Sequence, residues 1–354
     1  MSKIISILFL LALLMPTTIC RAQATVKGPA PTELVFAYFP MAVPVAPLGE
    51  VMRRDQLLTN RLAKQGLTIR FVPLNKGKEA VELLHQQHLD AVSFSDLPLI
   101  ESMAQADIQV LGIVKQSFSA VVAPRGTQMR ELRKKRIGTV PGSTSHYALL
   151  RALQAADIRE QEVTLIAMEA VELSDALAKG RVDAVAAWEP TPTVIMTNHP
   201  DRFSLIHRQS SYSYFVLSSR LLKKQPAAAR ELAAALVRAV RWLKKSPDNL
   251  AKASQWTLEG MTSLTGKPPQ LTAAEIAKIT SNDLLAIPGA PLLPAGEGSS
   301  GSPLQRTFSF MQQQGQVPAH LNWHTISSRM NPGMLREISA NPSRYLLNQF
   351  SYAP

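Results

Sequence analysis

The chain has 354 residues, of which 46% are apolar and 18% charged, so it is too apolar for a disordered polypeptide and long enough for one large or two ordinary domains. Its formal net charge is +12 at pH 7, and basic runs such as residues 133–136 fall in predicted turns or helix ends. Because no nucleic-acid recognition motif accompanies these runs, we interpret the excess as a solvated basic surface and exclude a nucleic-acid partner.

The first 24 residues are typical of a secretory signal peptide. Lys3 supplies a positive start, residues 4–15 form an apolar run, and Pro16 interrupts it before an Ala22-Gln23-Ala24 cleavage site. The apolar run is too short for an ordinary membrane span. We therefore expect residues 1–24 to be removed on export and the mature protein to reside in a bacterial periplasm.

The only cysteine, Cys20, lies inside this leader. A lipoprotein signal places a small residue before the cysteine, whereas Ile19 stands there, so a lipid anchor at Cys20 is disfavoured. Without Cys20 the mature chain has no thiol for a nucleophile, a disulfide or a thiolate metal site. A P-loop, a Gly-x-Ser-x-Gly motif and a His-Glu-x-x-His motif are also absent from the sequence. His85 and His88 are spaced for one helix face but have no apparent third ligand, so we expect no metal, no cofactor and no catalysis.

Strand and helix patterns alternate along the first part of the mature chain. Residues 34–39 predict a strand, residues 49–65 a helix, residues 67–72 a second strand and residues 78–87 a second helix. This alternation favours a largely parallel α/β sheet.

Two segments then repeat one pattern 93 residues apart. Residues 79–96 and 172–189 each contain a helix, an Asp-Ala-Val strand and a tip that ends in an acid. Helix–glycine–strand units also resemble one another by chance. We interpret the repeat as two lobes of similar architecture, with ligand-binding loops at the carboxyl ends of their strands.

Apolar strands at residues 120–123 and 212–217 are candidate crossovers between these lobes. We therefore assign residues 25–123 to the first lobe, residues 124–211 to the second lobe, and residues 212–354 to the return to the first lobe and a set of C-terminal helices.

The remainder of the chain is predicted to be mostly helical. Residues 227–245 and 272–285 show amphipathic helix patterns, and shorter helices are expected near residues 303–313 and 330–338. Residues 288–303 are rich in proline, glycine and serine, which predicts a long flexible loop.

The most informative stretch is residues 137–147, where a strand, a glycine turn and a hydroxyl-rich helix start follow one another. Such a start collects free backbone N–H groups that attract anions. Ser143, Thr144 and Ser145 are candidate hydrogen-bond donors to a ligand, although a serine at this place also caps a helix. His146 is either a further donor to an anionic ligand or a packed side chain.

Further candidates end the strands or lie near the return crossover, and in a two-lobed sheet these tips point into one cleft. Lys76 is suited either to balance an anionic head group or to remain solvated. Glu189 is suited to pair with a ligand amine or with a local arginine. Trp188 and Tyr214 are expected either to line the cleft or to fill the core. The complete set of these candidates is Phe39, Asn75, Lys76, Ser95, Asp96, Trp188, Glu189 and Tyr214.

Several of these segments match the motifs of a known family. Residues 131–138 (Glu-Leu-Arg-Lys-Lys-Arg-Ile-Gly) and 142–147 (Gly-Ser-Thr-Ser-His-Tyr) carry the first part of the match. The second part is Ala176-Leu177, Gly180, Val182-Asp183-Ala184, Trp188 and Pro190. On these motifs, the chain resembles the periplasmic substrate-binding proteins of ABC importers, in the subfamily for aliphatic sulfonates, taurine and nitrate.

The resemblance implies a type II periplasmic-binding-protein-like fold. In that fold two α/β lobes, each a mostly parallel sheet flanked by helices, are joined by two crossover strands and close on an unreacted solute. It also implies a small anionic or zwitterionic ligand, no cofactor, a monomer, and delivery to an ABC permease in the inner membrane.

Two other readings remain open. One is a thiamine-pyrimidine-type binding protein or enzyme, since fungal thiamine-pyrimidine synthases resemble this lobe pair, although their cysteine-rich motif is missing here. The other is a periplasmic sensor that docks on a signalling receptor when it closes.

Overall fold

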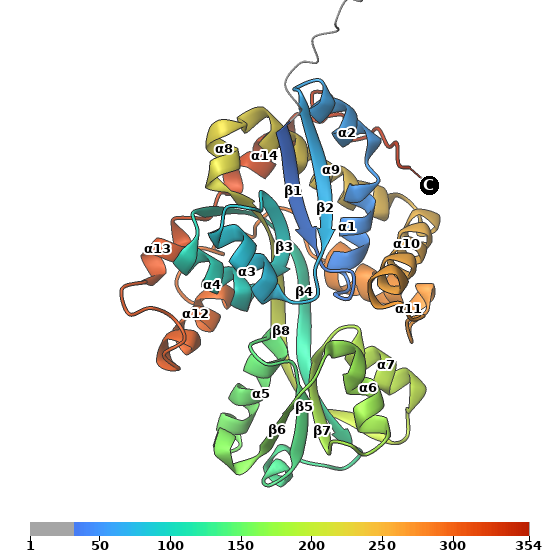
Figure 1. The fold of residues 1–354 in the computed structure, drawn as a ribbon, viewed down its shortest axis with the longest axis vertical. Helices are drawn as coiled ribbons and strands as arrows, with labels where there is room; N and C mark the ends of the chain where they lie inside the picture. Colours follow the sequence, from blue (N-terminus) through green and yellow to red (C-terminus); the bar gives the residue numbers. More distant parts are fainter. Residues whose placement is uncertain (1–31, 354) are drawn as a thin grey trace, which may run out of the picture. The chain divides into compact units, whose positions relative to one another are not determined.

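Eight strands form one mixed sheet in the order β2-β1-β3-β8-β4-β7-β5-β6 (Figure 1). The computed structural model describes residues 32–353, so the predicted signal peptide and Cys20 lie outside the described residues. Strands β2-β1-β3 and β7-β5-β6 pair in parallel, whereas β4 and β8 run antiparallel to their neighbours. The strands are β1 (Thr32–Tyr38), β2 (Leu67–Pro73), β3 (Ala91–Ser95), β4 (Ile108–Pro124), β5 (Arg136–Thr139), β6 (Thr164–Ala167), β7 (Ala184–Trp188) and β8 (Phe203–Ser218).

Helices flank both parts of this sheet. Within residues 32–353, no helix is both long enough and apolar enough to cross a membrane. The α-helices are α1 (Val45–Arg53), α2 (Gln56–Ala63), α3 (Gly77–His85), α4 (Asp96–Gln105), α5 (Thr144–Ala155), α6 (Ala170–Ala178), α7 (Thr191–Asn198), α8 (Ser219–Lys224), α9 (Pro226–Lys245), α10 (Pro247–Thr265), α11 (Ala273–Thr280), α12 (Pro303–Gln313), α13 (Trp323–Ser327) and α14 (Pro332–Ala340). Shorter helical segments are the 3-10 helices η1 (Met129–Leu132) and η2 (Glu160–Glu162) and the π-helix η3 (Ser281–Leu285).

The long strands β4 and β8 join two α/β lobes. They pair with each other along almost their whole length, and their opposite ends enter different lobes (Figure 1). Strand β3 of the first lobe pairs with β8, and strand β7 of the second lobe pairs with β4. The predicted two-lobed fold with two crossover strands is confirmed. Both crossovers are longer than residues 120–123 and 212–217, because β4 and β8 pair with each other from Ile108–Ser218 to Pro124–Phe203, through polar as well as apolar residues.

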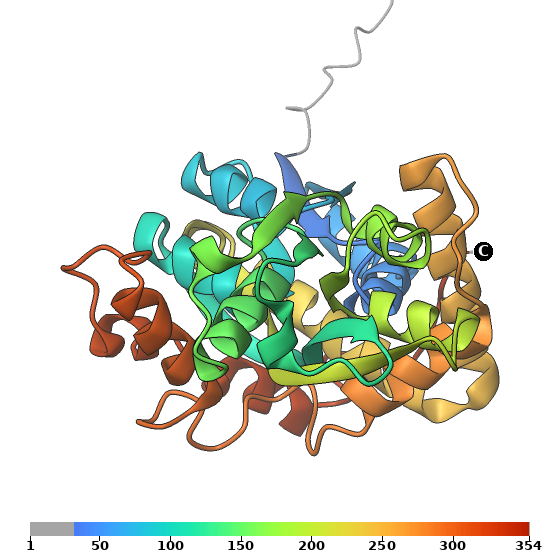
Figure 2. The ribbon, with the colours of Figure 1, turned by 90° about the horizontal axis from the view of Figure 1, so that it is seen from below.

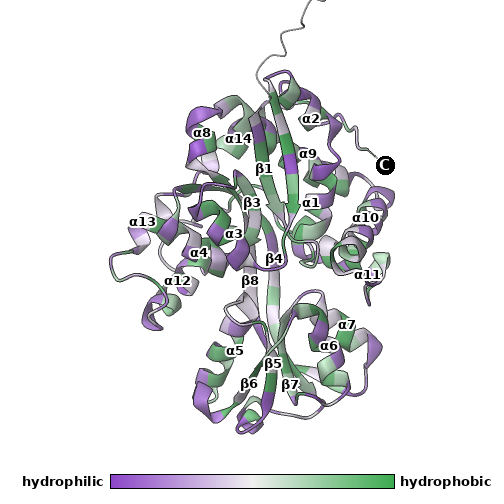
Figure 3. Cartoon of the chain, viewed as in Figure 1, coloured by the Kyte–Doolittle hydropathy of each residue, from purple (hydrophilic) through white to green (hydrophobic). Residues whose placement is uncertain are grey.

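Apolar faces of strands and helices fill both lobes, and polar helix faces lie outside them (Figure 3). In the second lobe, α5 covers one face of the strands, and α6 and α7 cover the other (Figure 2). In the first lobe, the predicted amphipathic helix is α9, whose Leu232, Leu236 and Val240 are fully buried. Each such side chain contributes about 1.5–3 kcal/mol to folding.

The 93-residue repeat is present in the structure. Strands β3 and β7 start 93 residues apart, and each pairs antiparallel with a crossover strand. Their last residues, Ser95 and Trp188, are equivalent, as are the acids Asp96 and Glu189 that follow. Both acids are buried.

The prediction of one helix over residues 49–65 is wrong, because α1 ends at Arg53 and α2 starts at Gln56. Asp55 causes the break. Its Oδ1 caps α2 by accepting the Leu58 N–H at 3.0 Å, and its Oδ2 accepts from Arg238 Nη2 of α9 at 2.7 Å.

The predicted loop at residues 288–303 contains no helix or strand before α12 starts, but it is packed rather than loose. The Pro291 carbonyl accepts the Ile113 N–H at 3.0 Å, and the Glu297 carboxylate accepts the Tyr214 hydroxyl at 2.6 Å. The segment therefore fastens the C-terminal helices to the crossover strands.

Candidate functional site

A cleft of about 460 Å³ lies between the two lobes. The first lobe lines it with the ends of β1 and β3, the residues after β2 and the start of α1. The second lobe supplies the starts of α5 and α6 and the end of β7. Lys115 of β4 and Ser213 of β8 lie on the floor between them. Of the predicted site residues, the lining contains Phe39, Asn75, Lys76, Ser95, Ser143, Thr144 and Trp188.

The start of α5 is built as the sequence predicts. Gly142 adopts a φ of 70°, which glycine tolerates best, and this turns the chain into the helix. The Ser143 hydroxyl caps α5 by accepting the His146 N–H at 3.2 Å and lies 3.0 Å from the Ser145 hydroxyl. Ser143 therefore combines the capping role with a place in the cleft lining.

Thr144 connects this helix start to the first lobe. Its Oγ1 lies 3.0 Å from Ser95 Oγ and donates toward Asp96 Oδ1 at 3.4 Å. Asp96 is 2% exposed and also accepts from the Leu97 N–H and the Thr307 hydroxyl of α12. Burial raises the pKa of Asp96 to about 6, while nearby Lys115 and these hydrogen bonds oppose that rise.

Five predicted site residues are absent from the cleft lining that the structure gives for the described chain. Asp96 and Glu189 are buried behind it, and Glu189 Oε2 accepts the Thr193 N–H at 3.3 Å. Ser145 is fully buried. His146 Nδ1 accepts the Gly142 N–H, and burial lowers the pKa of His146, so its imidazole is neutral at pH 7. Tyr214 is 0% exposed, so of the two alternatives for this residue the structure has core packing.

Charged residues face one another at the cleft mouth. Lys76 Nζ of the first lobe lies 2.7 Å from Glu169 Oε1 of the second lobe. Both side chains are half-exposed, so Glu169 neutralises the charge of Lys76 while the ammonium stays in contact with water. Trp188 lines the cleft from the end of β7 and is partly buried.

Lys115 is the main site residue that sequence reasoning missed. Its side chain is 5% exposed, yet it lines the cleft. Burial lowers the pKa of Lys115, whereas the carboxylates of Asp96, Asp283 and Glu189 oppose that change. The available signal was weak, because Lys115 directly follows the apolar residues 110–114 but is itself followed by the polar Gln116 and Ser117.

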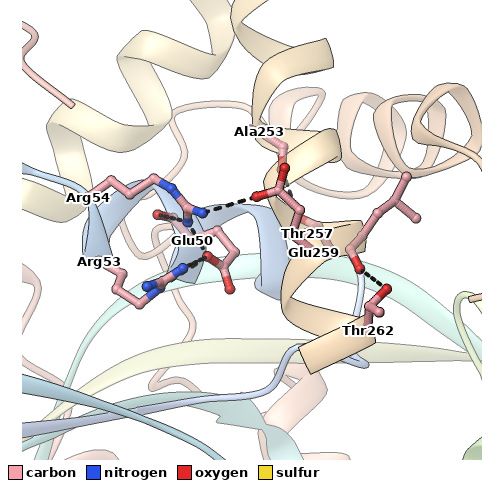
Figure 4. Close-up of polar contacts among 8 residues, drawn as sticks. Glu50, Arg53, Arg54, Ala253, Thr257, Glu259 and Thr262 are labelled. Atoms are coloured by element: carbon pink, nitrogen blue, oxygen red, sulfur yellow. Dashed lines mark hydrogen bonds and ion pairs between the residues drawn. The ribbon is translucent and has the colours of Figure 1, made fainter. Parts of the chain in front are cut away.

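A polar cluster joins helices α1 and α10, which together form one wall of the cleft. In Figure 4 the buried Glu50 of α1 faces α10 and lies between Arg53 and Arg54. Arg54 also reaches Glu259 of α10 at 3.5 Å and stacks over the Trp256 ring at 4.5 Å. Because the start of α1 and the end of α10 both line the cleft, this cluster fixes the position of that wall.

Comparison with known proteins assigns the chain to a family. The family model described as "NMT1/THI5 like" matches residues 62–250, more than half of the chain. The chain belongs to the NMT1/THI5-like family. The matched range contains the helix start at Ser143, the tip at Trp188 and the crossover residue Lys115.

This NMT1/THI5-like chain is 27% identical over 150 residues to an Escherichia coli (strain K12) protein whose description names aliphatic sulfonates as what it binds. That match covers 40% of this chain and 46% of the relative, so the chain spans about half the length of this relative. It is 22% identical over 293 residues to the taurine-binding periplasmic protein of Escherichia coli (strain K12), covering 74% of this chain and 83% of that protein. The resemblance seen in the sequence is thereby confirmed.

Solved structures share the fold. The alkanesulfonate-binding protein SsuA from Xanthomonas axonopodis pv. citri has a TM-score of 0.62 at 20% identity, covering 86% of this chain and 99% of that one. The nitrate-binding protein NrtA from Synechocystis PCC 6803 has a TM-score of 0.64 at 11% identity, covering 90% and 92%. The desulfurization enzyme DSZB has a TM-score of 0.60 at 15% identity, covering 88% and 99%. The fold therefore serves both binding proteins and an enzyme.

Proposed function

We propose that this protein is an exported solute-binding protein that captures a small anionic or zwitterionic compound for an ABC importer. The observation that carries the proposal is a cleft between two lobes that gathers strand ends, the hydroxyl-rich start of α5 and one buried ammonium. The names of the relatives, which refer to aliphatic sulfonates and taurine, support this ligand class.

The capture step follows from the contacts between the lobes. Lys76–Glu169 and Thr144–Ser95 join groups from opposite sides of the cleft, so they exist only while the lobes are closed. A ligand held by both lobes adds contacts to this closed state alone and therefore shifts the protein toward it. The solute is then released unreacted to a permease in the inner membrane.

Further parts of the proposal concern the cellular setting. Residues 1–24 serve as a signal peptide, and the mature protein is a periplasmic monomer. The chain passes between the lobes within β4 and β8, and on β4 it does so before Ser119, because residues 119–122 already pair with β7. Likeness to DSZB keeps an enzymatic role as the principal competing hypothesis. A sensor would use the same closed form to contact a signalling receptor instead of a permease.

Isothermal titration calorimetry of the mature protein tests the function. The panel consists of taurine, alkanesulfonates, nitrate and thiamine-pyrimidine analogues, each recovered afterwards and checked for conversion. We expect one anionic or zwitterionic compound to bind with a Kd of about 1 μM or lower and to be recovered unchanged. Thr144→Val is expected to weaken that binding, whereas substitution of the exposed Thr59 of α2 (Thr59→Val) leaves it unchanged. Binding of cations alone, or chemical conversion of the ligand, would contradict the proposal.

A further inference from the structure

A polar row crosses the floor of the cleft over three neighbouring strands. Ser95 of β3 pairs in register with Ser213 of β8, and Ser213 pairs in register with Lys115 of β4. Directly paired residues on adjacent strands project from the same face of a sheet. All three side chains line the cleft, and so does Ser93, two residues before Ser95 on the same face.

Two members of this floor lack a partner. The Ser93 hydroxyl is buried and has no hydrogen-bond partner within residues 32–353. Lys115 is buried, with only 5% of its surface exposed to solvent. In the described part of the chain, its ammonium forms no ion pair within 4.0 Å. Leaving a charge buried in this way is unfavourable unless an opposite charge and hydrogen bonds compensate it.

The neighbouring carboxylates do not supply that compensation at short range, because each is engaged elsewhere. Asp96 accepts from Thr307 and from other donors described above, and Glu189 accepts from the Thr193 N–H. Asp283 accepts from the Ser117 hydroxyl. These acids therefore favour the charged form of Lys115 from a distance and leave its N–H groups available on the cleft side.

We propose that Lys115, together with Ser93 and Ser213, forms the head-group site of the cleft and binds an oxyanion of the ligand. This inference rests on the proposed function and adds the place where the anion binds, which is on β3 and the two crossover strands rather than at the α5 start alone. An ammonium and two hydroxyls offer several donors at one point, which suits a group with two or three oxygens sharing a negative charge.

The rest of the cleft defines the body of the ligand. Phe39, Met41, Val45, Trp188 and Leu264 give the walls an apolar surface. The cleft volume of about 460 Å³ is many times the roughly 30 Å³ that one water molecule occupies in the liquid. A bare inorganic oxyanion leaves most of this space to water, so the cleft favours an organic oxyanion with an apolar body.

The test compares matched lysine substitutions in the full-length mature protein. Lys115→Met removes the buried charge and keeps most of the side-chain volume. Lys64→Met is the control, because Lys64 is an exposed lysine at the end of α2 and is not among the residues that line the cleft. Calorimetry uses hexanesulfonate and hexanoate as organic oxyanions, nitrate as the bare anion and hexanol as the neutral analogue. Thermal unfolding of each variant establishes that it is folded.

The wild type is expected to bind an organic oxyanion more tightly than nitrate or hexanol. Lys115→Met is expected to lose about 30-fold or more in affinity, in the range of a lost charge-assisted hydrogen bond, while Lys64→Met changes affinity less than about threefold. Ser213→Ala, which removes one donor with little effect on packing, is expected to weaken binding by about three- to tenfold.

Unchanged affinity of folded Lys115→Met and of Ser213→Ala would overturn the head-group assignment and leave the solute-binding function intact. Wild-type protein that binds hexanol as tightly as hexanesulfonate would also overturn it. Absence of binding to any solute by the wild type would instead overturn the proposed function and the inference with it.

Discussion

Lys76 and Glu169, which lie 2.7 Å apart across the cleft mouth, are themselves 93 residues apart and extend the spacing of the repeat at residues 79–96 and 172–189 by three positions. Each is the N-cap residue of a helix that starts one position later, α3 in the first lobe and α6 in the second. The two lobes therefore meet at matching positions, with opposite charges placed where closure brings them together.

The Lys76–Glu169 pair is expected to contribute weakly and only to the closed form. Half-exposed ion pairs are worth about 0–1 kcal/mol, so Lys76→Met or Glu169→Gln should lower ligand affinity by no more than about fivefold. A double-mutant cycle by calorimetry measures the coupling. The double variant should lose no more ligand affinity than either single variant, and this loss of affinity should become smaller at high salt. Additive losses that ignore salt would mean that the pair does not act as a unit.

Asp96 is expected to make stability depend on pH. Its pKa is about 6 in the fold instead of the usual 3.8, because burial disfavours the carboxylate. The folded protein then binds a proton that the unfolded chain has lost, so the free energy of unfolding falls as pH rises from about 4 to about 6 and changes little from this source above it. The effect is of order 3 kcal/mol.

Urea unfolding of wild type and Asp96→Asn at about pH 4.5 and about pH 7.5 measures this contribution. Burial also raises the pKa values of Glu189 and Asp283, so only the difference between the two proteins isolates Asp96. The free energy of unfolding of Asp96→Asn, measured relative to that of the wild type, should be higher at about pH 7.5 than at about pH 4.5. An identical pH dependence in both proteins would contradict the assignment.

Gly260 of α10 is expected to be required for the contact with α1. A Cβ at this position would lie 2.5 Å from Glu50 Oε1, and Arg53 and Arg54 hold that carboxylate through its other oxygen. Gly260→Ala should therefore destabilise the protein by about 1–3 kcal/mol despite the better helix propensity of alanine.

Gly333→Ala is the matched control for Gly260→Ala. Gly333 is exposed in helix α14, and a Cβ added there would meet its nearest neighbour, Asn331 Oδ1, at an ordinary contact distance of 3.7 Å. This control should be neutral or slightly stabilising in thermal unfolding. Equal effects of the two substitutions would show that Glu50 moves aside without cost.

Among the ion pairs, the buried Arg238–Asp55 pair is expected to cost the most stability when one partner is removed. Both side chains are almost fully buried, and Arg238 also donates to the Tyr345 carbonyl at 3.0 Å, which ties the C-terminal segment to α9. Asp55→Ala removes the α2 cap and leaves the guanidinium unpaired, so we expect a loss of about 3–5 kcal/mol in unfolding experiments. Glu33→Ala, which breaks the exposed pair with Arg70, should cost less than about 1 kcal/mol.

The sequence predicts the strand ends well, because the apolar strands that end at Ser95 and Trp188 are local patterns. It does not predict Lys115, because the burial of one lysine depends on which strands pair with β4. The break between α1 and α2 has the same origin, since the cap at Asp55 is held by Arg238, 183 residues away in the chain. Contacts of this range become visible only once the fold is known.

Native mass spectrometry of the freshly purified mature protein tests the central claim most directly. The expected spectrum shows the protein with one small organic anion, which is released unchanged in mass when the protein unfolds and is lost in Lys115→Met. A bound molecule that leaves as a reaction product, or a cation or neutral compound retained equally by Lys115→Met, would contradict the capture of an unreacted anion in the cleft.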